Sequence, residues 1–204
     1  MSRSIRLIAA LAVVASLALA SIALAKPAQS VKINGGSTTV TISSAATTVL
    51  NNNNLTVKPL APATASGSTF TFPIGRGRMN AKLRGDVITK GGFAFSNGTR
   101  TVRLRKLTVI SNKNGVSIWA LAPIHSKNTC KPGKAKMVKR CKLVITYRVA
   151  RIARVTGVTI SNKTATGTVK LTALSAGVIN NLAGKKVAAA GTPIGTATLS
   201  PTFG

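Results

Sequence analysis

A series of short apolar stretches separated by turn-forming residues constrains the fold of this chain more than any other feature. Within residues 91–122, GGFAFSNGTRTVRLRKLTVISNKNGVSIWALA, Asn-Gly pairs at 97–98 and 114–115 separate stretches of alternating apolar and polar side chains. Asn-Gly favours two-residue hairpin turns, and the alternation is typical of a half-buried strand. We therefore predict an antiparallel meander, with a bulge or an edge twist near Lys106, where the apolar residues change from one face of the strand to the other.

Other parts of the chain have the same character. STFTFPI (68–74) alternates, CKLVITYRVARIARV (141–155) predicts a long strand, and VTGVTISNKTATGTVKLTA (155–173) predicts a further hairpin. Helix is expected only at 44–54 and 175–186, where a serine precedes a short run that ends in Asn or Gly. Aromatic residues make up 3% of the chain, so aliphatic side chains must build the core. The prediction is a mainly β protein, an antiparallel β-sandwich-like domain with one or two short helices.

The two helix candidates belong to stretches that align without a gap. VTISSAATTVLNN (40–52) and VKLTALSAGVINN (169–181) both predict a strand followed by a short helix that ends in paired Asn. Two similar strand–helix units flanking a central meander are one interpretation. Chance similarity in a chain rich in Ala, Thr and Val is the other.

The first 25 residues have the form of a secretory signal peptide. They combine a basic start, an apolar run and the small-residue ending Ala23-Leu24-Ala25. The alternative is a retained membrane anchor, because the apolar run approaches the roughly 18 residues that span a bilayer. We predict a signal peptide at 1–25 and a single β-rich domain at 26–204, secreted or at the cell surface, with no transmembrane segment after signal cleavage.

The charge of the chain is strongly one-sided. Twenty-nine Lys and Arg residues accompany a single acid, Asp86, for a formal net charge of +28. Such a chain attracts polyanions, and for an exported protein we expect an anionic cell-wall polymer or polysaccharide as partner. A cationic surface that only keeps the protein soluble is the alternative. Specific nucleic-acid binding is not expected, because the basic stretches lack interleaved aromatic residues.

The stretch CKPGKAKMVKRCK (130–142) concentrates this charge. In an exported chain the two cysteines, Cys130 and Cys141, predict a disulfide that closes a short hairpin, with a two-cysteine metal site as the alternative. We expect the loop to bind anionic envelope polymer through its basic residues, which are Lys131, Lys134, Lys136, Lys139, Arg140 and Lys142.

Missing residue types argue against an enzyme. With only Asp86 as an acid and His125 as a histidine, paired-carboxylate catalysis is excluded, and no nucleophile-elbow or phosphate-loop motif occurs. No metal site and no catalytic residue are predicted. His125 or Tyr147 could serve as a haem-iron ligand, since that role needs only one or two side chains. The alternatives are a surface-loop imidazole for His125 and a packing role for Tyr147.

Three stretches resemble a known domain family. TFTFPIGRGRMNAKLRGDVITKGGFAF (69–95), TVRLRKLTVIS (101–111) and the closing segment 169–203 are similar to the Htaa (haem-transport-associated) domains of secreted actinobacterial proteins. The likeness covers residues 68–122, with a looser match to the end. It implies an exported β-sandwich-like domain at the cell envelope, in a family whose better-known members bind haem through Tyr and His.

The chain departs from that family at two places. Lys90 stands where the family has a His before the Gly-Gly turn, and no counterpart of its early aromatic-rich segment with the ligand Tyr occurs before Phe70. Two hypotheses follow. The first is a non-enzymatic secreted or cell-surface protein that interacts electrostatically with anionic envelope components. The second is a haem-binding module of the Htaa type that uses Tyr147 or His125.

Overall fold

The computed structural model describes residues 29–132 and 139–204, and it describes side chains outside 124–146. The predicted signal peptide at 1–25 therefore lies outside the described residues. The elements are β1 Val31–Ile42, α1 Ser44–Asn52, β2 Thr56–Leu60, β3 Thr64–Ser66, β4 Thr69–Met79, β5 Gly85–Thr89, β6 Gly92–Ser96, β7 Thr101–Asn112, β8 Gly115–Pro132, β9 Lys139–Ser161, β10 Thr164–Leu171, α2 Ala173–Ala183 and β11 Pro193–Phe203.

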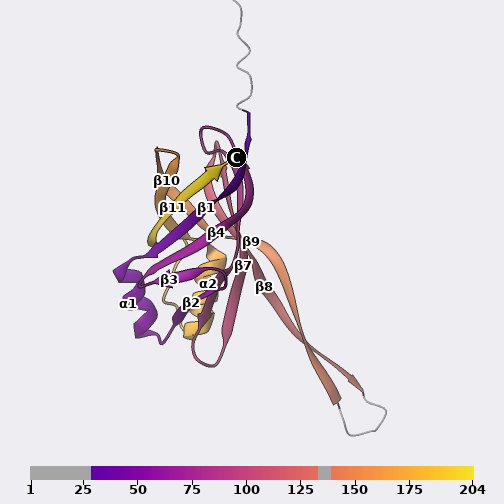
Figure 1. Ribbon diagram of the computed structural model, residues 1–204. Coiled ribbons are helices and arrows are strands. Elements are labelled where there is room, and N and C mark those ends of the chain that lie inside the picture. The colour runs from indigo at the N-terminus through magenta and orange to yellow at the C-terminus, as the bar shows by residue number, and fades with distance from the viewer. Residues whose placement is uncertain (1–28, 133–138) are drawn as a thin grey trace, which may run out of the picture.

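The strands close into a ring. Eight of them form an antiparallel barrel in the order β7-β5-β4-β1-β11-β10-β9-β8, and β8 pairs back to β7. β6 and β2 extend the sheet from β7, and β3 pairs with β4 (Figure 1). The prediction of a mainly β, antiparallel fold is confirmed. The sandwich is corrected to a barrel, because pairing of β1 with β11 at one seam and of β7 with β8 at another leaves no separate second sheet.

The predicted bulge lies at the point where β7 changes partner. Residues before Lys106 pair with β6, and residues from Thr108 onward pair with β5. Lys106 itself has a positive φ of 51°, and the register with β8 shifts between Arg105 and Thr108. Because of the extra residue, both Leu104 and Leu107 are buried. The single strand β7 therefore pairs with both β6 and β5 while its apolar side chains face the core.

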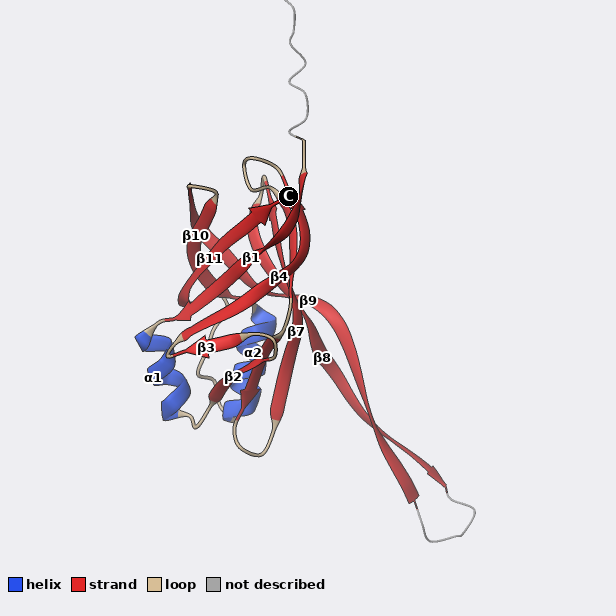
Figure 2. Cartoon of the chain, viewed as in Figure 1, coloured by secondary structure: helices blue, strands red, loops and turns tan. Residues whose placement is uncertain are grey.

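Both predicted helices form, and each follows a strand as the aligned stretches predicted. α1 has Ser43 as its N-cap, whose side chain accepts from the Ala46 N–H. α2 begins earlier than predicted because Thr172 is its N-cap, while Ser175 reaches back to complete a capping box. The two helices lie at the same end of the barrel (Figure 2).

The barrel is filled mainly by aliphatic side chains, as its composition requires. A small aromatic cluster adds to them: the ring of Phe93 meets Phe70 and Phe72 edge to face, with centroids 5.2 and 4.7 Å apart. Gly92 permits the close approach of β6 to β7, because a Cβ there would overlap the carbonyl oxygen of Leu104 on β7. A separate cluster of Leu55, Leu171 and the buried face of α2 lies under the helices.

Candidate functional site: an apolar cavity beneath the helices

A cavity of about 200 Å³ lies between the barrel interior and the two helices. The strands supply one wall with Val40, Phe93, Leu104, Ile152 and Val169 among others. The helices supply the opposite wall, through Val49 and Leu50 of α1 and Val178 and Ile179 of α2. Nearly all of these groups are hydrocarbon, so the cavity offers apolar surroundings to a ligand.

The two helices hold their positions differently. No residue of α1 is buried, and Val49, which lines the cavity, is 40% exposed. α2 buries Ala176, Ile179 and Leu182. Since burial of apolar area is the main source of helix stability in proteins, α1 is the more weakly held cover of the cavity.

Side chains tie α2 to its surroundings on two sides. The Asn180 carboxamide accepts from the N–H groups of Val187 and Ala188, both at 2.8 Å, and donates to the Ala188 carbonyl at 2.9 Å. On the other side, the Arg100 guanidinium donates to the Asn181 side chain and carbonyl. These contacts join α2 to the segment after it and to the Arg100 turn.

Three polar side chains are buried in the described part of the chain, and all three line this cavity: Thr38, Thr89 and Ser175. The Thr89 hydroxyl donates to the Leu107 carbonyl at 3.2 Å, and the Ser175 hydroxyl bonds to Thr172 and to the Ile152 carbonyl. The hydroxyl of Thr38 has no partner.

The structure does not bring the sequence-predicted site residues together in the cavity. Tyr147 lies on β9 opposite Pro123, is 44% exposed, and does not line the cavity. His125 pairs with Thr146 through the backbone of β8 and β9, and its side chain lies outside the described part. Lys90 is exposed, and its side chain lies over Gly75, whereas its neighbour Thr89 lines the cavity.

The basic loop also falls mostly outside the described part. Residues 133–138 are not described, and the side chains of the remaining loop residues Lys131, Lys139, Arg140 and Lys142 are not described either. Cys130 and Cys141 are directly opposite each other in the β8–β9 register, a relationship whose Cα separation suits a disulfide. Their side chains lie outside the description, so both the bridge and the anion-binding loop stay predictions.

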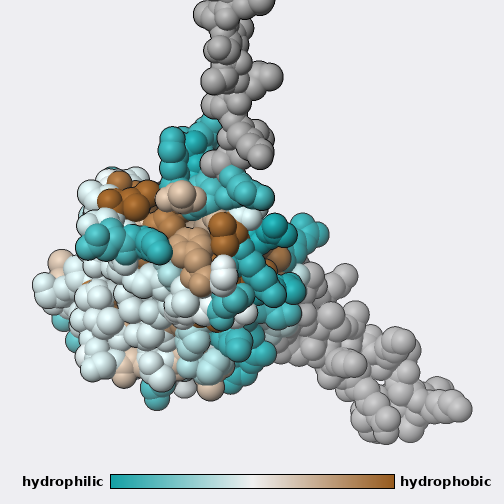
Figure 3. All heavy atoms as spheres, turned by 45° about the horizontal axis from the view of Figure 1, so that its top comes forward, coloured by the Kyte–Doolittle hydropathy of each residue, from teal (hydrophilic) through white to brown (hydrophobic). Residues whose placement is uncertain are grey.

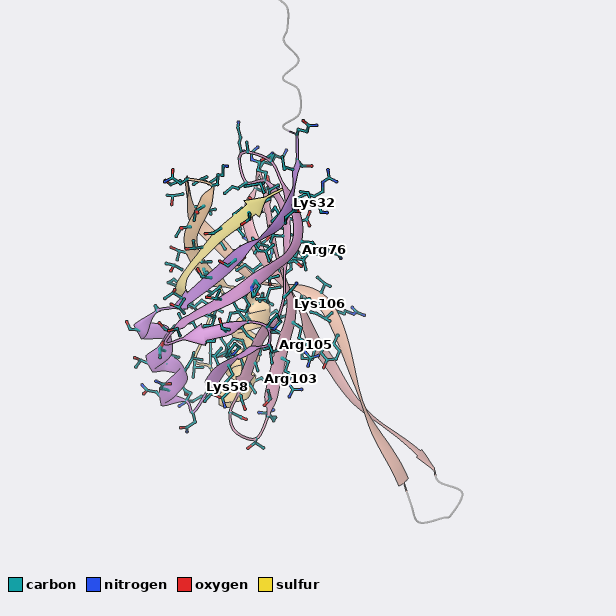
Figure 4. The ribbon with its side chains drawn as sticks, viewed as in Figure 1. Lys32, Lys58, Arg76, Arg103, Arg105 and Lys106 are labelled. Atoms are coloured by element: carbon teal, nitrogen blue, oxygen red, sulfur yellow. The ribbon has the colours of Figure 1, made fainter. Side chains whose placement is uncertain are left out.

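Cations gather on the outside of the described body. Six exposed cations are labelled in Figure 4: Lys32, Arg76, Arg103, Arg105 and Lys106 lie along one side of the body, and Lys58 lies on β2 at its lower end. Hydrophilic side chains also border that side of the space-filling view, whereas the broad face in front is nearly neutral in hydropathy (Figure 3). The outer surface on that side is therefore cationic, whereas the cavity wall is apolar. Within residues 29–123 and 147–204, no cluster of three or more His, Cys, Asp or Glu side chains exists to hold a metal.

Comparison with solved structures shows which known proteins share this architecture. The C-terminal domain of HtaA from Corynebacterium glutamicum aligns with 85% of this chain and 99% of its own length, at 12% identity and a TM-score of 0.56. The N-terminal domain of the same protein aligns with 81% of the chain and 97% of its own length, at 14% identity and a TM-score of 0.52. The chain has the HtaA fold.

A third solved structure of this fold is the haem-binding protein HtaB from the same organism. It covers 86% of this chain and 96% of its own length, at 16% identity and a TM-score of 0.50. No protein-family model matches the sequence, and comparison with curated proteins finds no match. The resemblance that the sequence suggested is thus confirmed at the level of the fold. No described helix is both long and apolar enough to cross a membrane.

Sequence reasoning did not identify the cavity. Its wall is assembled from strands far apart in the chain, and each contributes ordinary aliphatic side chains. One signal was available: on β1 the inward parity reads Thr38, Val40, Ile42, which places a hydroxyl on the core face of a strand. A polar residue at a core position of a strand departs from the local pattern, and such departures are expected at functional or strained sites.

Proposed function

We propose that this protein is a non-enzymatic binding module that holds an apolar small molecule in the cavity between the barrel and its two helices. The observation that carries the proposal is the cavity itself, about 200 Å³ in volume. A ligand that fills this space removes apolar wall from contact with water, which is favourable.

The architecture supports the same proposal. An eight-stranded barrel has an interior just wide enough to be filled by side chains or to hold one small ligand. Apolar cavities of about 150 Å³ in other proteins stay dry and bind small apolar molecules. Because no residue of α1 is buried, this helix can move to let such a ligand enter without disrupting core packing.

Haem is the ligand that the solved neighbours suggest, since HtaB is a haem-binding protein. The apolar wall suits the face of a porphyrin. However, no His, Tyr, Met, Cys or Lys lines this cavity in the described part of the chain, so it offers no side chain to ligate iron. Its volume of about 200 Å³ suits a ligand smaller than a porphyrin, because sites for drug-sized ligands have roughly 300–1,000 Å³. The residues present therefore do not fit a haem coordinated in this cavity.

Two ligands test the proposal together. We would titrate hemin and the neutral fluorophore N-phenyl-1-naphthylamine into the purified protein at high salt, where attraction between the cationic surface and the haem propionates is screened. Saturable enhancement of the fluorophore, lost when the cavity is filled by mutation, is the expected result. Absence of saturable binding by the fluorophore would exclude the proposal.

The hemin arm addresses the alternative of haem bound through Tyr147 or His125. A one-to-one Soret shift abolished by Tyr147→Phe or His125→Ala would establish an iron ligand outside the cavity. Hemin that displaces the fluorophore without a ligation spectrum would instead compete for the cavity without ligation of its iron. An unshifted Soret band in wild type and both variants would remove haem ligation from consideration.

A second function rests on the cationic side of the body. We propose that these exposed Lys and Arg side chains, on a protein at or outside the cell surface, adsorb to anionic envelope polymer. The proposal is supported by four exposed cations on one side of the body: Arg76, Arg103, Arg105 and Lys106. Adsorption to wall polymer should be strong at low salt and weak at high salt; adsorption independent of salt would contradict it.

A further inference from the structure

Thr38 is the exceptional group of the cavity wall. It is 4% exposed and lies on β1 between Phe72 of β4 and Leu199 of β11. The other two buried polar side chains on the wall are fully engaged with backbone carbonyls. A buried hydroxyl that lacks a partner loses its hydrogen bonds to water without replacement, which is unfavourable in a folded protein.

Thr38 lies in a wall shared by two spaces. Besides the main cavity it also lines a smaller one of about 40 Å³, whose other walls include Val109, Val155 and Leu199. The Thr38 oxygen has almost no surface open to solvent as it is placed, so a rotation about χ1 is needed to turn the hydroxyl toward a ligand.

We infer that Thr38 hydrogen-bonds the polar end of the ligand, and that the ligand is a neutral, mostly hydrocarbon molecule with one alcohol or carbonyl group. This inference rests on the proposed function of the cavity and names its ligand class. An apolar body suits the aliphatic walls beneath α1 and α2. A single uncharged oxygen suits the unpaired hydroxyl of Thr38, which can donate to a carbonyl and can either donate to or accept from an alcohol.

The wall also excludes a charged head group. No Lys or Arg side chain lines the cavity in the described part, although the chain carries 29 such residues. A carboxylate buried against Thr38 would have no counter-charge, and an isolated buried charge is far more costly than a neutral hydroxyl. The cationic residues belong to the outer surface and do not select the ligand inside.

A double-mutant cycle between protein and ligand tests the inference. We would measure displacement of N-phenyl-1-naphthylamine by 1-octanol and by octane from wild type and Thr38→Val, which replaces the hydroxyl by a methyl group of similar size. Octanol affinity should fall at least fivefold in Thr38→Val, while octane affinity is unchanged or improved. Octanoate should bind more weakly than octanol to both proteins.

Thr89→Val is the matched control, because it makes the same substitution on the same wall where the hydroxyl is already bonded to Leu107. It should change octanol and octane affinity by equal factors, and thermal melts would establish that both variants fold. Equal changes for both ligands in Thr38→Val would overturn the role of Thr38 and leave the cavity as a binding site. Failure of fluorophore and octane to bind wild type would overturn the cavity function itself, and the inference with it.

Discussion

Filling the cavity with a larger side chain should make the protein more stable and abolish ligand binding. Ala153 on β9 lines the cavity and is 5% exposed. Ala153→Ile adds three carbons, which gain about 2.4 kcal/mol if fully buried at about 0.8 kcal/mol each. Loss of rotamer freedom removes about 0.5–1 kcal/mol. A net gain of about 1–2 kcal/mol corresponds to a rise of about 2–8 °C in Tm for a domain of this size.

Ala120→Ile is the control for this experiment. Ala120 on β8 is 1% exposed and belongs to the same core cluster, but it does not line the cavity. The same added carbons then overpack a filled core, at a cost of about 1–3 kcal/mol. Calorimetry measures both Tm values, and fluorophore titration measures binding. A loss of stability in Ala153→Ile equal to that in Ala120→Ile, with ligand binding retained, would refute the cavity as described.

Further changes test individual groups. Thr38→Val should raise the Tm of the ligand-free protein by about 2–4 °C, since removing an unpaired buried hydroxyl is worth about 1 kcal/mol; a lower Tm would mean that the hydroxyl is bonded. Thr172→Ala should lower stability by about 0.5–2 kcal/mol through loss of the α2 capping box, with faster amide exchange in that helix. Gly92→Ala should cost more than about 2 kcal/mol, because its Cβ would overlap the Leu104 carbonyl; a melt like that of wild type would contradict the close approach. Replacing Arg105 and Lys106 by Gln should weaken low-salt adsorption to anionic wall polymer and leave fluorophore binding unchanged.

Local patterns in the sequence predicted local structure well. The helices at 44–54 and 175–186, the bulge near Lys106 and the hairpin within 155–173 follow from capping residues, side-chain parity and turn chemistry over a few neighbours. The start of α2 was misjudged because both Thr172 and Ser175 are good capping residues. The structure uses both, one as N-cap and one as its partner in the capping box.

Such local patterns could not predict which strands far apart in the sequence pair with each other. A sandwich and a barrel use the same alternation within each strand, and they differ only in which strands meet. Here the pairing of β1 with β11 joins the two ends of the described chain, and no local signal in either strand specifies the other. The cavity was harder still to predict from the sequence, because it exists only where side chains from distant strands and two helices do not fill the space between them.

Ligand binding in the apolar cavity and adsorption through the cationic surface can be separated by experiment, because they depend on different atoms and respond differently to salt. Cations at the surface interact over about 10 Å at 0.1 M salt and over about 3 Å at 1 M, so adsorption through them must weaken steeply as salt rises. A neutral guest in the cavity has no charge to screen, and no charged side chain lines its wall in the described part. Raising the salt should therefore release the protein from anionic polymer with its ligand still bound. A neutral ligand lost in parallel with adsorption would mean that the outer surface, and not the cavity, holds it.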